Sequence, residues 1–489
     1  MKKSISLLSA LLLSAPLLSA CVATPPTTPQ VAEVKQENLG LAGADAPHFP
    51  AAWWKAFGDP QVDRLAEQVM AGNPTLAGAL ARMRAAQSQL AVNQAEDLPQ
   101  VTLDGSEQRT LFSKNYIIPP PYGGSYAWYG SLAGNFSWNL DFWGKQADLI
   151  AQARATADGA ALDAQAARLA LGGSFAQTYI NLLLNYQNGD IADQAVAERG
   201  EILKISQGRF DAGLENGSAV AQAKALLAQA RADQLRFAAA READVHAIAA
   251  LAGQGAEAYA TITRPTPNLA VALPLPDKLP ADLLSRRPDI LAARARVEAA
   301  VQGRAAAKAD FYPDINLAAM AGFQSLGLAN LLTGGSFTMG LGPAIHLPIF
   351  DAGKLKAQYA GATAGLDIAV ADYNGAVLNS IKQTADAMTQ VKSLAAQAQQ
   401  QREAATNAEK AFRIAEDRYR SGLDTQLPML TAESTLLQAR SALAAVTAAA
   451  AQQRITLLLT VGGGFEYAPA ALAASEKINT QIAKDVSHD

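Results

Sequence analysis

The chain has 489 residues, of which 50% are hydrophobic but only 6% are aromatic, and its formal net charge is −4. Much of the apolar share is alanine, which buries little area per residue, so the composition favours long, closely packed helices over a thick globular core. The weak negative charge, without a concentrated basic face, excludes nucleic acid as a partner.

The N-terminus resembles a bacterial lipoprotein signal. Two lysines precede an apolar run that ends in Leu-Ser-Ala-Cys, with Cys21 as the only cysteine in the chain. We predict that residues 1–20 are removed and that Cys21 carries a covalent lipid, diacylglycerol with palmitate; the alternative is an ordinary signal peptide with a chance cysteine. Val22, in place of an aspartate, favours export to the outer membrane. Residues 21–52, rich in Pro and Thr, are interpreted as a lipidated tether.

The remainder is built from an internal repeat. RFDAGLE at residues 209–215 recurs as RYRSGLD at 418–424, an offset of 209, and upstream the offset becomes 214. We therefore predict a first repeat over 53–253, a Pro-rich linker over 254–285, a second repeat over 286–462 and a C-terminal tail over 463–489.

Each repeat opens with a helix of about 25 residues. Pro74 and Pro288 occupy the first helical positions, with Asn73 as N-cap and Arg287 expected to do the same work. Alternating strands follow. In residues 132–140 and 337–347, one face is apolar and the other is small or polar, a pattern typical of membrane β-strands but also of a half-buried soluble hairpin. Four strands do not close a useful barrel, so a barrel requires several chains.

The next stretches predict two very long helices, from Gly144 to Gly213 and from Gly353 to Gly422, with the terminal glycines as C-caps. At 1.5 Å per residue each spans roughly 100 Å. No other charge-free apolar stretch suggests a transmembrane helix.

Returning helices of about 33 residues are expected to start at Ser218, as N-cap, and at Pro428, as first helical residue. They are too short to pair along the whole long helix. We therefore expect each to stack end to end with the 25-residue helix. The two shorter helices together do not cover the full length of the long helix. An irregular belt at the midpoint, formed by the WWKAFGDP segment, the linker and the tail, would fill the remaining length.

Together these features resemble the TolC-like outer-membrane factor family, and more narrowly its NodT-type lipoprotein subunits of multidrug efflux systems. The resemblance covers residues 53–462. It rests on the lipobox, on WWKAFGDPQVDRL, on LDFWGK and IFDAGK after the return strands, and on the RFDAG and RYRSG helix ends.

The resemblance implies a mainly α fold with a small β part, in which duplicated helix–hairpin–helix–turn–helix units form a homotrimer. Its parts would be a shared 12-stranded transmembrane β-barrel and a long periplasmic α-helical barrel. The trimer would lie in the lipid of the outer membrane of a Gram-negative bacterium and would be the passive exit duct for drugs or toxic small molecules, opened by rearrangement of the helix tips at its periplasmic end. A periplasmic membrane-fusion adaptor and an inner-membrane transporter of RND, MFS or ABC type would be its partners.

It also implies roles for residues near the helix tips. The adaptor-contact positions are Gly213, Leu214, Glu215, Asn216, Gly217, Gly422, Leu423, Asp424, Thr425 and Gln426. Candidates for a periplasmic gate are Leu427, Thr431, Asp424, Glu433 and Gln222. The chain departs from the acidic rings of many relatives, since Pro428 and Thr431, and Ala219 and Gln222, fill those positions. Leu427 would form an apolar constriction, and Asp424 and Glu433, the nearest acids, are either part of a like-charged ring or solvated charges at a helix end. Arg209 and Arg418 are candidates for an inter-helix lock, or simply complement the helix dipole.

Two other classes of function are alternatives to an outer-membrane channel. An enzyme is not expected, because the four histidines are isolated and no GxSxG, HExxH or nucleotide motif is present; no cofactor other than the lipid is expected. A periplasmic coiled-coil lipoprotein, acting as scaffold or adaptor without a pore, shares the helices and the anchor and remains the alternative.

Overall fold

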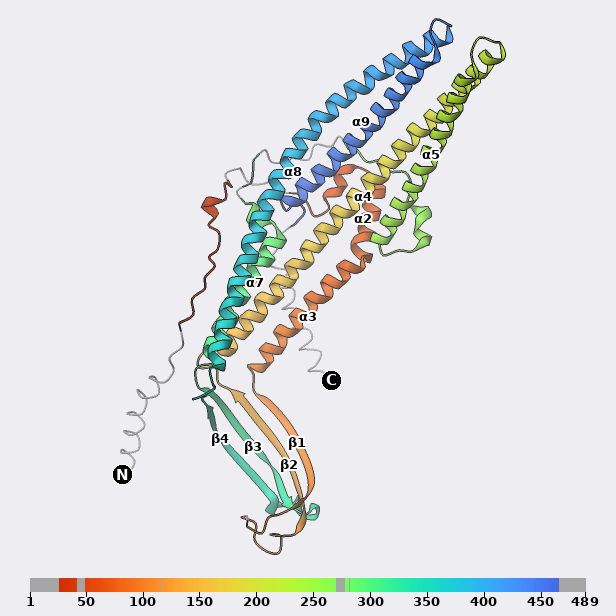
Figure 1. The fold of residues 1–489 in the computed structure, drawn as a ribbon. Helices are drawn as coiled ribbons and strands as arrows, with labels where there is room; N and C mark the ends of the chain where they lie inside the picture. Colours follow the sequence, from red (N-terminus) through yellow and green to blue (C-terminus); the bar gives the residue numbers. More distant parts are fainter. Residues whose placement is uncertain (1–25, 42–48, 116, 270–277, 281, 466–489) are drawn as a thin grey trace. The chain divides into compact units, whose positions relative to one another are not determined.

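The computed structural model describes residues 26–41, 49–115, 117–269, 278–280 and 282–465. The predicted leader, Cys21 and most of the C-terminal tail lie outside these described residues. The chain is mainly helical with one four-stranded sheet (Figure 1). It divides into two compact units, the first mainly from residues 83–160 and 293–373, and the second mainly from residues 34–82, 161–292 and 374 onward. Each unit therefore contains parts of both sequence repeats.

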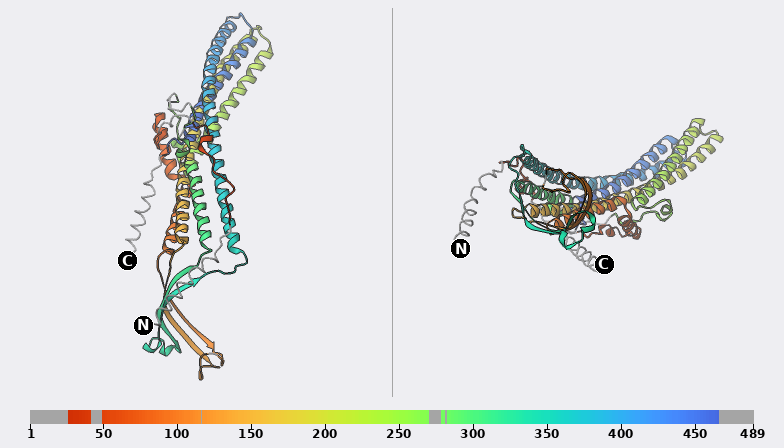
Figure 2. Two further views of the ribbon diagram at one scale, coloured as in Figure 1. Left: turned by 90° about the vertical axis from the view of Figure 1, so that its left-hand side faces the viewer. Right: turned by 90° about the horizontal axis from the view of Figure 1, so that it is seen from below.

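The sheet of the first unit has the strand order β1-β2-β3-β4, all antiparallel. Its strands are β1 (Gln100–Leu111), β2 (Tyr126–Asn139), β3 (Asp314–Leu326) and β4 (Phe337–His346). The predicted strand positions are thus confirmed, and Figure 2 shows the sheet as a curved ribbon. Among the described residues, β1 and β4 are its two open edges.

The register brings the apolar positions of all four strands onto one face. Leu103 pairs with Gly134, Gly134 with Ala321, and Ala321 with Met339. Leu103 and Met339 are 73% and 72% exposed. The opposite face is polar: Asp104 accepts hydrogen bonds from its own strand and from β2. The expected alternation therefore extends across the whole sheet.

Long helices continue from the strands. They are α3 (Pro74–Glu96), α4 (Lys145–Asp211), α7 (Pro288–Ala309) and α8 (Lys354–Arg420). Their predicted extents are confirmed to within three residues. In the first unit, Lys145 of α4 pairs with Asp310 just after α7, with Nζ 2.7 Å from Oδ1.

An N-terminal segment lies along α8. The backbone N–H groups of Gln30 and Val31 donate to the Asp367 carboxylate at 2.8 and 3.0 Å. Farther along, the N–H of Val34 donates to the side-chain oxygen of Asn374 at 2.8 Å. Residues 30–34 of the predicted tether are therefore bound to the surface of α8.

The second unit contains the other helices. They are α2 (Pro60–Gly72), α5 (Gly217–Leu251), α6 (Leu283–Arg286) and α9 (Gln426–Thr460). The described 3₁₀ helices of the chain are η1 (Gln36–Asn38), η2 (Trp53–Phe57), η3 (Ala256–Thr261), η4 (Leu328–Asn330) and η5 (Gly334–Ser336). Figures 1 and 2 show the α4–α5 hairpin beside the α8–α9 hairpin.

The main core of the second unit joins the predicted belt segment to the helices. Trp53 and Trp54 pack in one cluster with Tyr179 of α4 and Leu458 of α9. The Tyr179 hydroxyl donates to the buried Asp59 carboxylate at 2.7 Å. Burial is the main cause that raises the pKa of Tyr179, so this phenol stays a donor.

Helix α9 is the one described helix that is long and apolar enough to cross a membrane. Its side chains Ile455, Leu457 and Leu458 are nevertheless buried in the core cluster with α4. This packing accounts for part of its hydrophobicity, since 33% of its most apolar window is buried.

The short helices stack end to end, as predicted. Asn73, before α3, donates its side-chain N–H to the carbonyl of Leu251 at the end of α5, at 2.9 Å. In the second repeat Arg287 donates to the carbonyl of Thr460 at 3.3 Å. Asn73 also caps α3 by accepting from the N–H of Leu76 at 3.0 Å. The prediction that Arg287 would cap α7 in the same way is wrong, because a guanidinium has no acceptor.

The predicted starts of the returning helices are two residues late. Asn216, not Ser218, caps α5, since its side-chain oxygen accepts from the N–H groups of Ser218 and Ala219. Helix α9 begins at Gln426, so Pro428 is its third residue. Proline fits there because the first N–H groups of a helix have no partner within it.

Candidate functional site at the hairpin tips

The two hairpins end in the same turn. Gly213 has φ of 71°, and the N–H of Leu214 donates to the carbonyl of Arg209 at 2.8 Å. In the other hairpin Gly422 has φ of 72°, and the N–H of Leu423 donates to the carbonyl five residues back at 2.9 Å. Left-handed glycines allow this closure because they carry no Cβ.

Each tip presents an exposed leucine at the same position of the turn. Leu214 is 70% exposed and Leu423 is 71% exposed. Asn216, Gly217 and Thr425 are also exposed, whereas the adaptor-contact candidate Gln426 is only 4% exposed. Its side-chain amide donates to the Ser206 hydroxyl of α4 at 2.7 Å, so the structure places it in a helix–helix contact.

Arg209 connects the first tip with α8. Its Nε lies 3.4 Å from Oε2 of Glu215, and its guanidinium lies 5.1 Å from the ring centre of Tyr419. The Tyr419 hydroxyl in turn donates to the same Glu215 oxygen at 3.2 Å. Three side chains from two hairpins therefore form one cluster, which we call the tip cluster.

Arg418 forms the repeat-equivalent ion pair. It binds Asp424 of its own loop, with Nε 3.2 Å from Oδ2, and both side chains are at least one-third exposed. Both repeat-related arginines thus pair with the acid six residues along in their own loop, and of the two only Arg209 also contacts the other hairpin, through the Tyr419 ring.

A buried ion pair joins the hairpins farther from the tips. Arg199 of α4 donates from Nε to Oε1 of Glu433 on α9 at 2.9 Å, and from Nη1 to the carbonyl of Leu226 on α5 at 2.9 Å. Glu433 is fully buried, and its second oxygen has no hydrogen-bond partner. Burial raises the pKa of Glu433, although Arg199 acts in the opposite direction.

This placement changes the interpretation of Glu433. The sequence suggested an acid facing the channel or a solvated charge, but within one chain its carboxylate is enclosed between helices. Arg199 was not among the predicted site residues. The sequence contains one hint of it. At the offset of 209, Ala408 corresponds to Arg199 and Lys224 corresponds to Glu433. An acid–base pair can therefore form only between the first-repeat copy of one position and the second-repeat copy of the other.

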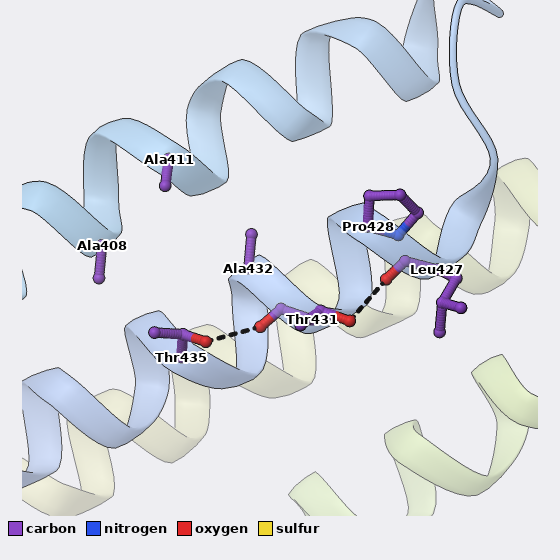
Figure 3. A pocket seen from close by; sticks show the side chains of 7 residues that line it. All are labelled: Ala408, Ala411, Leu427, Pro428, Thr431, Ala432 and Thr435. Atoms are coloured by element: carbon purple, nitrogen blue, oxygen red, sulfur yellow. Dashed lines mark hydrogen bonds between the residues drawn. The ribbon is translucent and has the colours of Figure 1, made fainter.

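Of the other gate candidates, Asp424 is partly buried and the remaining three are exposed. Leu427 is 63% exposed, and Gln222 and Thr431 are also exposed. The Thr431 hydroxyl donates to the carbonyl of Leu427 at 2.9 Å, as Figure 3 shows. Within the described parts of the chain, no group of three His, Cys, Asp or Glu side chains suits a metal ion.

Comparison with known proteins gives a consistent match. The family model described as outer membrane efflux protein matches residues 65–254 and 279–463. The fusaric acid resistance protein FusA of Burkholderia cepacia is 34% identical, over 72% of this chain and 68% of its own. The multidrug resistance outer membrane protein MdtP of Escherichia coli K12 is 30% identical, over 95% of this chain and 97% of its own.

A solved structure agrees. The outer membrane protein VceC of Vibrio cholerae superposes with a TM-score of 0.80 at 34% identity, covering 86% of this chain and all of that one.

Proposed function

The chain belongs to the outer membrane efflux protein family, and from this membership we propose how it works: three copies form one closed, passive conduit. It is an outer-membrane channel subunit of a Gram-negative efflux system. The energy for transport would come from elsewhere, because the sequence carries no nucleotide-binding motif.

The sheet is the observation that carries the proposal. It has a continuous apolar face and two open edges, and its strands are 10 to 14 residues long, enough to cross a bilayer at a tilt. Unpaired backbone groups at an edge are very costly in lipid. Edge-to-edge pairing of β1 and β4 between three copies satisfies them in a 12-stranded barrel, continued by an α-helical barrel.

The partners follow from the same class of protein. As the outer-membrane component, the chain would receive cargo through a periplasmic adaptor from an inner-membrane transporter. The exposed Leu214 and Leu423 offer apolar contacts for the adaptor at equivalent places on both hairpins. The names of FusA and MdtP point to toxic organic acids and drugs as cargo. A covalent lipid on Cys21 would add membrane affinity.

The tip cluster is the proposed closure of the periplasmic end. The Arg209 guanidinium, the Tyr419 ring and the Glu215 carboxylate hold two hairpins together. Adaptor binding would shift the hairpins to an arrangement without these contacts, a rearrangement of packed helices between discrete states.

The test is conductance combined with export. Purified protein in planar bilayers is expected to give trimer-dependent channels, and deletion of the gene is expected to increase drug sensitivity until the gene is restored.

Replacing Tyr419 with Phe, which removes the hydroxyl contact to Glu215, should raise the open fraction of the channel about 5- to 10-fold, in line with roughly 1 kcal/mol for one hydrogen bond. A protein without conductance in any assembly would instead favour the scaffold lipoprotein.

A further inference from the structure

The apolar face of the sheet ends in a cluster of exposed side chains at its outer end, the end away from the helices (Figure 1). Arg109 pairs with Trp128, and Leu111 pairs with Tyr126, across β1 and β2, so all four lie on the same face as Leu103. Tyr126 is 65% exposed and Trp128 is 50% exposed. We call the cluster of Arg109, Leu111, Tyr126 and Trp128 the outer collar.

The spacing of two tryptophans places the collar at the level of lipid headgroups. Trp128 and Trp138 share the apolar face of β2 and are ten positions apart, about 33 Å along the strand. At the tilt of about 40° that is usual in membrane barrels, they are roughly 25 Å apart across the membrane, the height of the apolar band between two aromatic girdles. The Trp138 indole N–H donates to the carbonyl of Asp97, just after α3, at 3.1 Å. Trp138 therefore belongs to the inner girdle and Trp128 to the outer one.

The turn after β3 adds apolar surface to the collar. Gly130 lies on the same face of β2 as Trp128, and a Cβ built on it would lie 3.6 Å from a methyl group of Leu328 and 3.5 Å from one of Leu331. This turn, which contains η4, therefore folds back over the apolar face. Leu328 and Leu332 are nevertheless 52% and 71% exposed. They offer a contact for acyl chains beside the cation of the collar.

The charges at the outer end of the sheet are positive. Over residues 108–130 and 315–345, the charged side chains are those of Arg109 and Lys114, which gives this region a net charge of +2 per chain. The Arg109 guanidinium lies 5.7 Å from the centre of the Tyr126 ring and has no carboxylate partner among the described residues. Glu107 is on the same face, two positions nearer the helices, and is the last acid of β1 before this region.

The opposite end of the sheet is acidic. Where the strands meet the helices, the aspartates outnumber the lysines; they are Asp97, Asp141, Asp310, Asp314 and Asp351. An anionic lipid is therefore attracted to the outer end and repelled from the inner end. In a Gram-negative outer membrane, the outer leaflet is the one built from a strongly anionic lipid, a glycolipid with phosphate groups and several acyl chains.

We propose that the outer collar binds this phosphorylated glycolipid, lipid A, with the Arg109 guanidinium on a lipid phosphate and the leucines of the η4 turn against its acyl chains. The planar guanidinium fits phosphate oxygens with two parallel hydrogen bonds. Lys114, exposed in the loop after β1, supplies a second cation to the headgroups. The indole N–H of Trp128, which has no hydrogen-bond partner among the described residues, donates at the same level. This inference rests on the barrel proposed above, because it requires the sheet to span the outer membrane.

Lipid binding to the full-length trimer tests the collar. The probes are purified lipid A and the same glycolipid without its phosphates, and bound lipid is counted by native mass spectrometry in a neutral detergent. Arg109→Gln is expected to weaken the binding of lipid A about 5-fold, and R109Q/K114Q about 25-fold, the range for one and two surface cations. The binding of the dephosphorylated lipid should not change.

Lys356→Gln is the matched control. It removes an exposed cation from the first turn of α8, at the acidic end of the sheet, and should leave lipid A binding at the wild-type level. A loss in K356Q equal to that in R109Q would overturn the assignment to the collar.

A cation moved by one position tests which face binds the lipid. R109Q/T110R keeps the net charge but places the arginine on the opposite face of β1, so it should bind lipid A as weakly as R109Q. Full recovery of binding in R109Q/T110R would show that net charge alone recruits the lipid and would overturn the proposal. Equal affinity of the wild type for phosphatidylglycerol and lipid A would overturn the assignment to the glycolipid.

The channel is scored separately. Trimer formation and bilayer conductance should be the same in the wild type and in R109Q, because the collar faces lipid. A conducting trimer that binds lipid A no better than the dephosphorylated lipid refutes the collar alone. A chain that forms no conducting trimer refutes the proposed channel, and the collar fails with it.

Discussion

At the scale of single residues, the Arg199–Glu433 pair breaks the symmetry of a duplicated protein, because the equivalent positions hold Ala408 and Lys224. Arg199 is 8% exposed and Glu433 is fully buried, so both ions have lost most of their hydration. Such pairs add little net stability, yet removing one partner leaves a buried charge uncompensated. Specific pairing of α4 with α9 is therefore the main consequence of this contact.

The two partners should respond differently to substitution. Arg199→Met leaves the Glu433 carboxylate buried without a cation and should destabilise the folded protein by about 3–5 kcal/mol. Glu433→Gln leaves the Arg199 cation without its carboxylate but keeps a side-chain acceptor for Nε, and the Leu226 carbonyl still accepts from Nη1, so the loss should be smaller, about 1–3 kcal/mol. Thermal unfolding of the detergent-solubilised protein measures both, and a greater loss of stability for Glu433→Gln than for Arg199→Met would contradict this account.

The pH dependence has a defined sign. The pKa of Glu433 is raised by burial above its ordinary value of 4.5, so the folded state favours the protonated form. Its contribution to stability is therefore largest below pH 4.5 and declines as the pH rises through the folded-state pKa. Relative to Glu433→Gln, the wild type should lose stability between acid and neutral pH, and a wild type that instead gains stability over this range would show the opposite shift.

At the scale of elements, the junction between stacked helices is built twice around a glycine. A Cβ on Gly253 would lie 2.1 Å from the carbonyl oxygen of Gly72, and one on Gly462 would lie 2.1 Å from that of Arg286. Both glycines have positive φ, at 67° and 74°. Backbone contact of this kind fixes where the end of one helix meets the end of another.

Three alanine substitutions separate contact from backbone strain. Gly253→Ala suffers both the clash with the Gly72 carbonyl and the backbone strain of a positive φ, so it should destabilise the folded protein by more than about 3 kcal/mol. Gly213→Ala has φ of 71° but open space around the added Cβ, so it should cost about 1–2 kcal/mol. Gly200→Ala lies within α4 with open space and should stabilise by about 0.5–1 kcal/mol. Unfolding midpoints rank the three, and equal effects at Gly253 and Gly213 would exclude the role of the Gly72 contact.

Much of this element structure is readable from local signals. Pro74, Pro288, Gly213 and Gly422 mark helix ends through effects confined to one turn. The cap at Asn216 was missed because Ser218 is an equally good cap by residue type, and only the backbone decides between them. Which helix lies against Glu433 was not predictable, since that contact spans 234 positions of the chain and leaves no local pattern.

At the scale of the whole molecule, the sheet has to be stable in lipid on one face and in water on the other. The alternation of side chains was visible in the sequence, but the alignment of four strands into one apolar surface depends on the register. Leu103 lies on that face and its neighbour Thr102 on the other, and both are exposed.

This neighbouring pair provides a matched test of membrane insertion. Leu103→Arg puts a cation on the apolar face and should cost up to about 2–4 kcal/mol of insertion free energy, depending on depth. Thr102→Arg should be tolerated. Recovery of folded trimer from outer membranes measures both, and equal recovery would indicate that this face is not in contact with lipid.

The glycine-closed turn occurs in both hairpins of a chain, yet the side chains next to it differ. In a ring made from three such chains, six loops of one shape would alternate between two chemical kinds. A substitution in the loop of one repeat then alters every second loop of the ring and leaves the loops between them unchanged. Gene duplication thus lets the two loops of a chain diverge in sequence independently, which a ring of six identical subunits does not permit.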